Sequence, residues 1–270
     1  MLPVSTALHL LLLGLGVGLA AVLALIPVRR TGSGFARTIT LVALGALAIA
    51  QAQDLYFRAA GGRRGLDAPA GWVAAAATLL ATFLLAGFAR ALRRPAEPHR
   101  GWPVAAACCG LGALAMTAAL LPTGDGALRL LSGAQGLAGA GVLGSSLSAM
   151  LLGHFYLVVP GLAIEPLRDL TRGFLGALLA RGLLSGLALA LIGLPRTDAA
   201  PDVRLMAVVL LTMRLMFGLL GPLVLGIMAE RTVAIRSTQS ATGILYGVVV
   251  FVLIGEGVAA HLLVRTGVPL

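Results

Sequence analysis

The sequence contains no lysine, and only 11% of its 270 residues are charged. Soluble domains usually carry about 25% charged residues, so a soluble chain this poor in charge would lack the polar groups to cover its surface. Apolar residue types make up 59% of the chain, and the mean hydropathy is +1.00. The lipid bilayer is therefore the expected solvent.

All 20 basic residues are arginines, which is typical of a GC-rich bacterial genome. A nucleic-acid-binding protein would gather such residues on one exposed face. Here they stand singly or in pairs, mostly at the ends of apolar runs, where membrane topology explains them. The net charge of +10 therefore does not indicate a nucleic-acid partner.

Several chemical signatures are also missing. The only two cysteines, Cys108 and Cys109, are adjacent in an apolar run, so they suit neither a disulfide nor a zinc site. The chain has no P-loop, metalloprotease, nucleophile-elbow or dinucleotide-binding motif, and no connection long enough to fold as a soluble domain. We therefore predict no catalytic residue and no metal site, while enzymatic activity and cofactors stay open.

Eight apolar runs suit membrane-spanning helices, for which about 20 residues are needed. They are expected at residues 4–28, 38–53, 71–92, 103–121, 130–159, 173–194, 205–228 and 243–264. Arginines or prolines follow most of these runs, as expected at helix ends. The sequence thus predicts an all-α, polytopic transmembrane bundle of about eight spans, forming a single integral membrane domain over residues 1–270.

The distribution of arginines predicts the orientation of the bundle. Eleven arginines flank the loops after spans one, three, five and seven: Arg29, Arg30, Arg37, Arg90, Arg93, Arg94, Arg100, Arg168, Arg172, Arg231 and Arg236. Seven lie at the opposite ends: Arg58, Arg63, Arg64, Arg129, Arg196, Arg204 and Arg265. Because arginine-rich loops stay in the cytoplasm, both termini are expected on the non-cytoplasmic side of a cell inner membrane.

Ionisable side chains inside the spans are the main functional candidates, because each costs about 3 kcal/mol or more at the bilayer centre. Arg214 and Glu256 are expected at similar depths, about 14 and 12 Å from the outer ends of their spans, and should pair. Arg181 and His154 lie nearer the inner ends and form a second candidate pair. Pro222 predicts a kink beside Arg214. His154, Arg181, Arg214 and Glu256 are thus the predicted ligand or proton pathway.

Histidines suggest a different chemistry. His9 and His261 are expected at one depth near the outer surface, and two histidines from different helices can ligate a b-type haem. His154 is followed by Phe155 and Tyr156. This string fits a proton relay, a haem or metal ligand or a quinone contact, and equally an anchor at the membrane interface.

Three further segments have structural interpretations. Small residues on the fifth span form a stripe that predicts a helix-packing face; they are Ala134, Ala138, Gly141, Ser145 and Ser148, bordered by Gly144. Asp54, with Gln51 and Gln53, is interpreted as the polar end of the second span. Residues 161–172 alternate leucines with charged residues and are expected to lie along the cytoplasmic interface.

Three functions remain open. The first is a permease-like protein that moves a small anionic solute or protons through a polar site in the bundle. The second is a membrane redox protein that binds haem or quinone through His9, His154 and His261. The third is a structural or assembly subunit of a membrane complex, in which buried charges fix the helix register. A membrane enzyme acting on lipids is a further alternative, and membrane-protein partners fit several of these.

Overall fold

The computed structural model describes residues 2–59, 69–94, 99–121, 126–159, 162–192 and 201–270. Within these ranges the only regular secondary structure is helical, and eight helical segments are long and apolar enough to cross a membrane. The predicted all-α bundle of about eight spans is therefore confirmed, and the chain is a multi-pass membrane protein.

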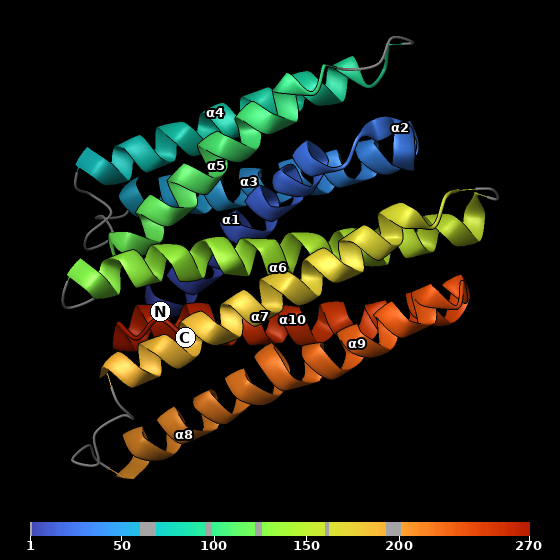
Figure 1. Cartoon of the computed structure of the whole chain (residues 1–270). Coiled ribbons are helices and arrows are strands. Elements are labelled where there is room, and N and C mark those ends of the chain that lie inside the picture. Colours follow the sequence, from blue (N-terminus) through green and yellow to red (C-terminus); the bar gives the residue numbers. More distant parts are fainter. Residues whose placement is uncertain (1, 60–68, 95–98, 122–125, 160–161, 193–200) are drawn as a thin grey trace.

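The helices follow one another with short connections (Figure 1). They are α1 (Leu2–Leu25), α2 (Val28–Thr31), α3 (Ser33–Ala59), α4 (Pro69–Ala91), α5 (Gly101–Ala119), α6 (Gly126–Val158), α7 (Glu165–Ile192), α8 (Pro201–Leu215), the π-helical turn η1 (Met216–Leu220), α9 (Gly221–Ala234) and α10 (Thr238–Thr266). The segments α8, η1 and α9 together form one span. The single-turn helix α2 connects the first span, α1, to the second, α3.

The centre of the bundle is formed by α1, α6 and α10. In the most apolar stretches of α1 and α6, 61% of residues are buried, whereas the figure for the α8–α9 span is 17%. α1 contacts α3, α5, α6 and α10. Figure 1 shows α4 and α5 along one edge of the bundle and α8 and α9 along the opposite edge.

Small residues let α1 and α6 approach until their backbones touch. A Cβ atom added to Gly144 would lie 2.7 Å from the Cα of Gly18. In a membrane such contacts stabilise helix pairs through van der Waals packing. The predicted stripe includes Gly141, three residues before Gly144, where an added Cβ would lie 3.2 Å from the Cβ of Ala177 on α7. The stripe therefore faces α7 at this point, and Gly144 beside it makes the tighter contact with α1.

The second span extends beyond its predicted end, because Asp54 does not end the helix. α3 continues to Ala59, and Asp54 is 5% exposed. Its carboxylate accepts a hydrogen bond from Arg58 one turn later, with 2.7 Å between Oδ2 and Nε. A carboxylate paired within its own helix needs no water, so the helix can bury it and continue.

The predicted interfacial segment is also corrected. α7 begins at Glu165, so residues 165–172 are the first turns of a spanning helix rather than a separate surface helix. Leu167 and Leu170 pack in the core, at 0% and 4% exposure. An acidic residue at the first position and Pro166 at the second both favour a helix start there.

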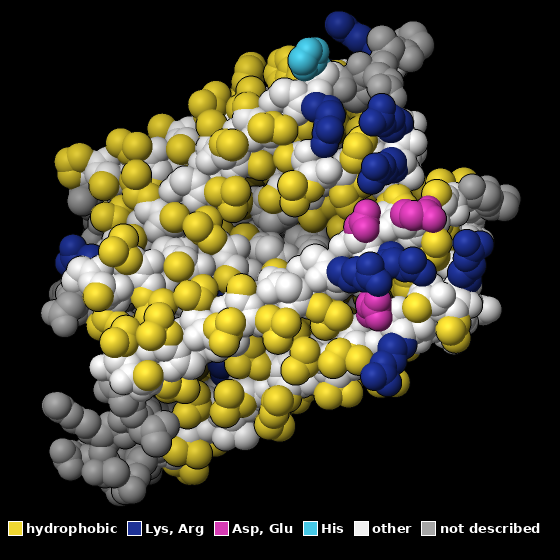
Figure 2. Space-filling model, in the orientation of Figure 1, with side chains coloured by type: hydrophobic (Ala, Val, Ile, Leu, Met, Phe, Trp, Pro, Cys, Tyr) yellow, Lys and Arg dark blue, Asp and Glu magenta, His cyan; other side chains and the backbone are white. Residues whose placement is uncertain are grey.

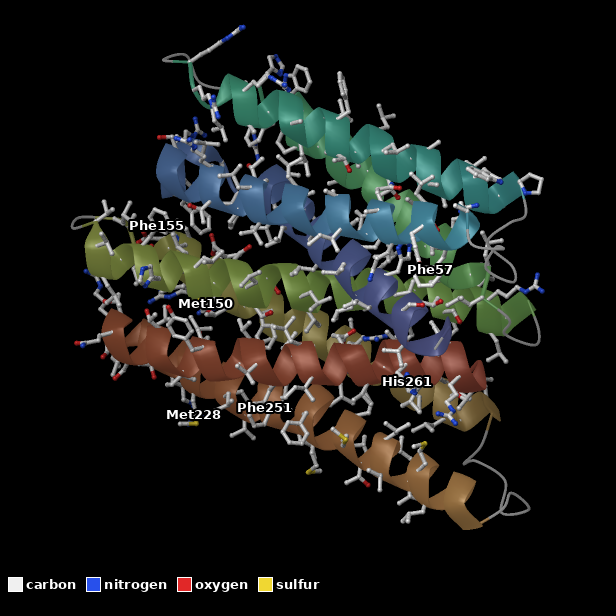
Figure 3. The ribbon with its side chains drawn as sticks, turned by 180° about the vertical axis from the view of Figure 1, so that it is seen from behind. Phe57, Met150, Phe155, Met228, Phe251 and His261 are labelled. Carbon is white, nitrogen blue, oxygen red and sulfur yellow. The ribbon has the colours of Figure 1, made fainter. Side chains whose placement is uncertain are left out.

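The irregularity expected at Pro222 takes the form of the π-helical turn η1. Proline lacks the N–H that would bond to the carbonyl of Gly218. The N–H of Gly221 instead donates to the carbonyl of Met216, and the helix continues as α9. A side chain at position 221 would overlap the ring of Phe251 on α10, which Figure 3 labels. The turn is thus packed tightly against α10.

Charged side chains gather at one end of the bundle (Figure 2). Two ion pairs lie there, with 4.0 Å between Arg30 Nη1 and Asp169 Oδ2 and 3.2 Å between Arg172 Nε and Glu230 Oε1. Arg100 donates to two carbonyls at the C-terminal end of α1, at 3.1 and 3.3 Å. The sequence predicts that this arginine-rich end faces the cytoplasm.

The first testable prediction concerns sidedness. Both termini lie at the end opposite the charged one (Figure 1), so both should be outside the cytoplasm. A C-terminal alkaline phosphatase fusion should be active in cells, and a C-terminal green fluorescent protein fusion should be dark. The reverse pattern would invert the orientation. Arg63, Arg64 and Arg196, which the arginine count includes, lie outside the described residues.

Candidate functional site

Three charged side chains from three helices meet inside the bundle. Arg181 comes from α7, Arg214 from the last turn of α8 and Glu256 from α10, and their exposures are 6%, 1% and 6%. We call these three residues the charge cluster. Charges in a membrane interior are tolerated where partners surround them, so the contacts within the cluster decide its chemistry.

Glu256 and Arg181 form a two-point ion pair. Arg181 donates from Nε to Oε1 at 3.1 Å and from Nη2 to Oε2 at 2.9 Å. This parallel arrangement is the strongest geometry for an arginine and a carboxylate. The third nitrogen of the guanidinium donates to the side-chain oxygen of Gln135 on α6. Each of the three guanidinium nitrogens of Arg181 therefore donates one hydrogen bond.

Arg214 binds the same carboxylate, at the oxygen that also accepts from Nε of Arg181. Its Nη1 donates to Glu256 Oε1 at 3.0 Å and to the carbonyl of Gly255 at 3.3 Å. The predicted pairing of Arg214 with Glu256 is thus confirmed. The structure adds Arg181, which the sequence analysis had paired with His154.

Glycines provide the space that the cluster occupies. A Cβ on Gly139 of α6 would lie 2.6 Å from Glu256 Oε2, and one on Gly218 would overlap the guanidinium of Arg214. Gly255 lies against the backbone of Gly218: a Cβ added to Gly255 would be 2.6 Å from the amide nitrogen of Gly218. Larger residues at these positions would displace the charged groups, so the glycines define the shape of the site.

The charge cluster is not electrically balanced. Two guanidinium groups share one carboxylate, which leaves one excess positive charge. Nε and Nη2 of Arg214 are buried and have no hydrogen-bond partner among the described residues. A buried donor without an acceptor costs about 1–3 kcal/mol, and more when it is charged. The charge cluster therefore carries a net positive charge and unsatisfied donors.

A cavity of about 50 Å³ adjoins the charge cluster. Its polar wall is formed by Gln135, Arg181 and Glu256, and the remaining walls are mostly leucine, alanine and glycine. Pro269 and Leu270 close one side, where Gln135 Nε2 lies 3.4 Å from the carbonyl oxygen of Pro269. One water needs roughly 10–15 Å³ on this measure, so a few waters or one small ion would fit.

His154, the fourth residue of the predicted pathway, lies elsewhere. It is exposed near the end of α6, whereas the guanidinium of Arg181, its predicted partner, binds Glu256 and Gln135. The neighbouring residues have structural roles. The ring of Phe155 (Figure 3) packs edge-on against Phe35, with 5.9 Å between the ring centres. The hydroxyl of Tyr156 donates to the carbonyl of Ala163, before α7. These contacts are compatible with the predicted interfacial anchor, which stays a prediction together with the other roles considered for the string.

The two histidines considered as haem ligands have different surroundings. His9 is 6% exposed, and its Nδ1 lies 3.0 Å from the carbonyl oxygen of Ala50 on α3. It lines a small cavity beside Asp54 and Arg58. His261 is half-buried near the end of α10 (Figure 3). Paired haem ligation by His9 and His261 stays a prediction.

The cavity beside His9 belongs to a second buried polar site that the sequence analysis missed. In addition to Asp54, Arg58 binds the carbonyl of Gly71 at 3.1 Å, and its guanidinium carbon lies 4.2 Å from the ring centre of Trp72. Side-chain exposures of Arg58 and Asp54 are 7% and 8%. The signal was present in the sequence as an acid and an arginine four residues apart.

No protein-family model, curated protein or solved structure matches this chain. Its function must therefore be inferred from the geometry of the charge cluster.

Proposed function

We propose that this protein binds a small monovalent anion at the charge cluster and moves it, as a permease does, across a bacterial inner membrane. The observation that carries the proposal is the excess positive charge, since Arg214 retains two unpartnered nitrogens at 1% exposure. A monovalent anion would neutralise that charge. The cavity of about 50 Å³ suits an ion of the size of chloride, nitrate or formate.

Competition for Glu256 would couple anion binding to a rearrangement. Glu256 now accepts two hydrogen bonds from Arg181 and one from Arg214. An anion that entered the cavity and bound Arg181 would displace the carboxylate. The carboxylate would then turn towards Nε and Nη2 of Arg214, which are free to receive it. Each arginine would have an acceptor in the occupied state, whereas the empty state leaves two donors unsatisfied.

The second testable prediction is anion-dependent stability. In detergent, sodium chloride, nitrate or formate should raise the unfolding temperature by roughly 5 °C near saturation, relative to sodium gluconate at equal ionic strength. Arg181→Gln should abolish this rise, because it removes the arginine that lines the cavity. Arg172→Gln on the same helix is the matched control. Its side chain is 61% exposed, so the rise should persist.

Flux measurements separate binding from transport. In proteoliposomes containing an anion-sensitive dye, the parent protein should transport the anion that stabilises it, and Arg181→Gln should not. Stabilisation without flux would support anion binding at the charge cluster but contradict anion transport. If no anion stabilises the protein specifically, the structural-subunit alternative is favoured. Proton transport would then be tested with a pH-sensitive dye in the same proteoliposomes. A Soret absorbance band in the same preparation would support the haem alternative.

A further inference from the structure

A groove of about 340 Å³ lies between α1, α6 and α7 and extends inward from the arginine-rich end. Glycine, alanine and serine form much of its wall, including Gly18, Gly141, Ser145 and Gly173. The rest of the lining is aliphatic or proline, from α1, the connection after it and α7, except for Arg30 and Asp169. Because all three helices are candidate spans, the inner part of this groove lies at the depth of the hydrocarbon.

The shape of the groove follows from the small residues. α1 is held against α6 at Gly18, which places the helices too close for a large side chain on the floor. Gly173 has no atom within 4 Å of the place where a Cβ would stand. The wall on α7 runs from Pro166 to Gly173, or about 10 Å along the helix. No described side chain fills this stretch of the groove. Its length matches a segment of a lipid acyl chain.

Two opposite charges stand at the mouth of the groove. Arg30 and Asp169 both line it, and their side chains are each 58% exposed. Their nearest charged atoms are 4.0 Å apart, at the outer limit of an ion pair. Neither group is saturated by the other. The mouth therefore presents an N–H donor cation and a carboxylate acceptor side by side.

We propose that the groove binds a phospholipid whose headgroup carries a phosphodiester and a primary ammonium, namely phosphatidylethanolamine. The phosphodiester accepts hydrogen bonds from Arg30, and the ammonium donates to Asp169. One acyl chain lies along the glycines of the groove. Phosphatidylcholine has no N–H to donate to the carboxylate, and phosphatidylglycerol has no cation. The site is independent of the proposed anion transport.

Native mass spectrometry of the full chain tests the proposal. Delipidated protein in detergent is mixed with dioleoyl phosphatidylethanolamine, phosphatidylcholine or phosphatidylglycerol. The first should be retained about two- to fivefold more than either of the others, which is the effect of one exposed ion pair. Asp169→Asn should remove this preference. Arg231→Asn, at the same end but outside the groove, should leave it intact.

A second pair of variants tests where the lipid sits. Gly173→Phe would fill the groove, whereas Gly176→Phe on the same helix meets equally open space outside it. Only the first should lower phosphatidylethanolamine retention. Equal retention by both folded variants would overturn the location. A preference for phosphatidylglycerol that Asp169→Asn leaves unchanged would overturn the choice of lipid. If Gly173→Phe does not fold, the surface change Asp169→Asn decides alone.

Discussion

Replacing Glu256 by leucine is expected to destabilise the bundle more than any other substitution in the charge cluster. Within the described part of the chain, Glu256 is the sole ion-pair partner of both Arg181 and Arg214. Its loss would leave two guanidinium groups buried without a counter-charge. Removing one partner of a buried ion pair costs about 3–5 kcal/mol, and two pairs would break here. The unfolding temperature in detergent should fall by roughly 10 °C or more.

Two controls identify the cause of that loss. Glu230→Leu breaks the ion pair with Arg172, whose side chain is 61% exposed, and should cost at most about 1 kcal/mol. Adding Arg214→Leu to Glu256→Leu should recover part of the stability, because one of the two unpaired charges is removed. A Glu256→Leu protein that unfolds at the parent temperature would show that water already solvates the arginines.

A single methyl group on Gly18 is expected to have the second largest effect. In Gly18→Ala the new Cβ would overlap the carbonyl oxygen of Ala140 and lie 2.9 Å from the amide nitrogen of Gly144. These are backbone atoms, so α1 and α6 would have to separate. Overpacking typically costs about 1–3 kcal/mol, and the upper end is expected for two central helices. Thermal unfolding in detergent measures the loss.

Gly45→Ala provides the matched control on α3. Nothing lies within 4 Å of a Cβ at that position, and Gly45 is exposed. Alanine is the better helix former by about 1 kcal/mol, so this variant should unfold at the same or a slightly higher temperature. If Gly18→Ala unfolded at the temperature of Gly45→Ala, α1 and α6 would be more loosely packed than described.

The spans and the pairing of Arg214 with Glu256 could be predicted from the sequence because both follow from counting residues along apolar runs. Hydrophobic runs give the number of helices, and 1.5 Å per residue converts position into depth. Two charges at one depth in neighbouring helices will meet if both face inward. The same reasoning failed for Arg181 because it measured depth from a helix start near residue 173. α7 begins at Glu165, so Arg181 lies 16 residues, or about 24 Å, into the helix.

Residues whose charge is satisfied locally were harder to interpret. Asp54 looked like a helix end because an isolated carboxylate would be costly in the bilayer. Its partner Arg58 was counted only among the arginines that set the topology, so their pairing within α3 was missed. Gln135 was missed for a different reason. It carries no charge, and its role depends on the guanidinium that α7 brings to it. Only the packing of α6 against α7 could reveal it.

The π-helical turn determines which way Arg214 points. Buried positions along this span follow one another at intervals of four, from Arg214 to Gly218, Pro222 and Gly226. On a regular α-helix, three such intervals drift by about 120° around the axis, so Arg214 would turn away from the face that holds Gly226. One extra residue per turn takes back up to about 100° of that rotation. The turn thus rotates α8 about the helix axis relative to α9. Without it, the guanidinium of Arg214 would point towards the lipid acyl chains rather than towards Glu256.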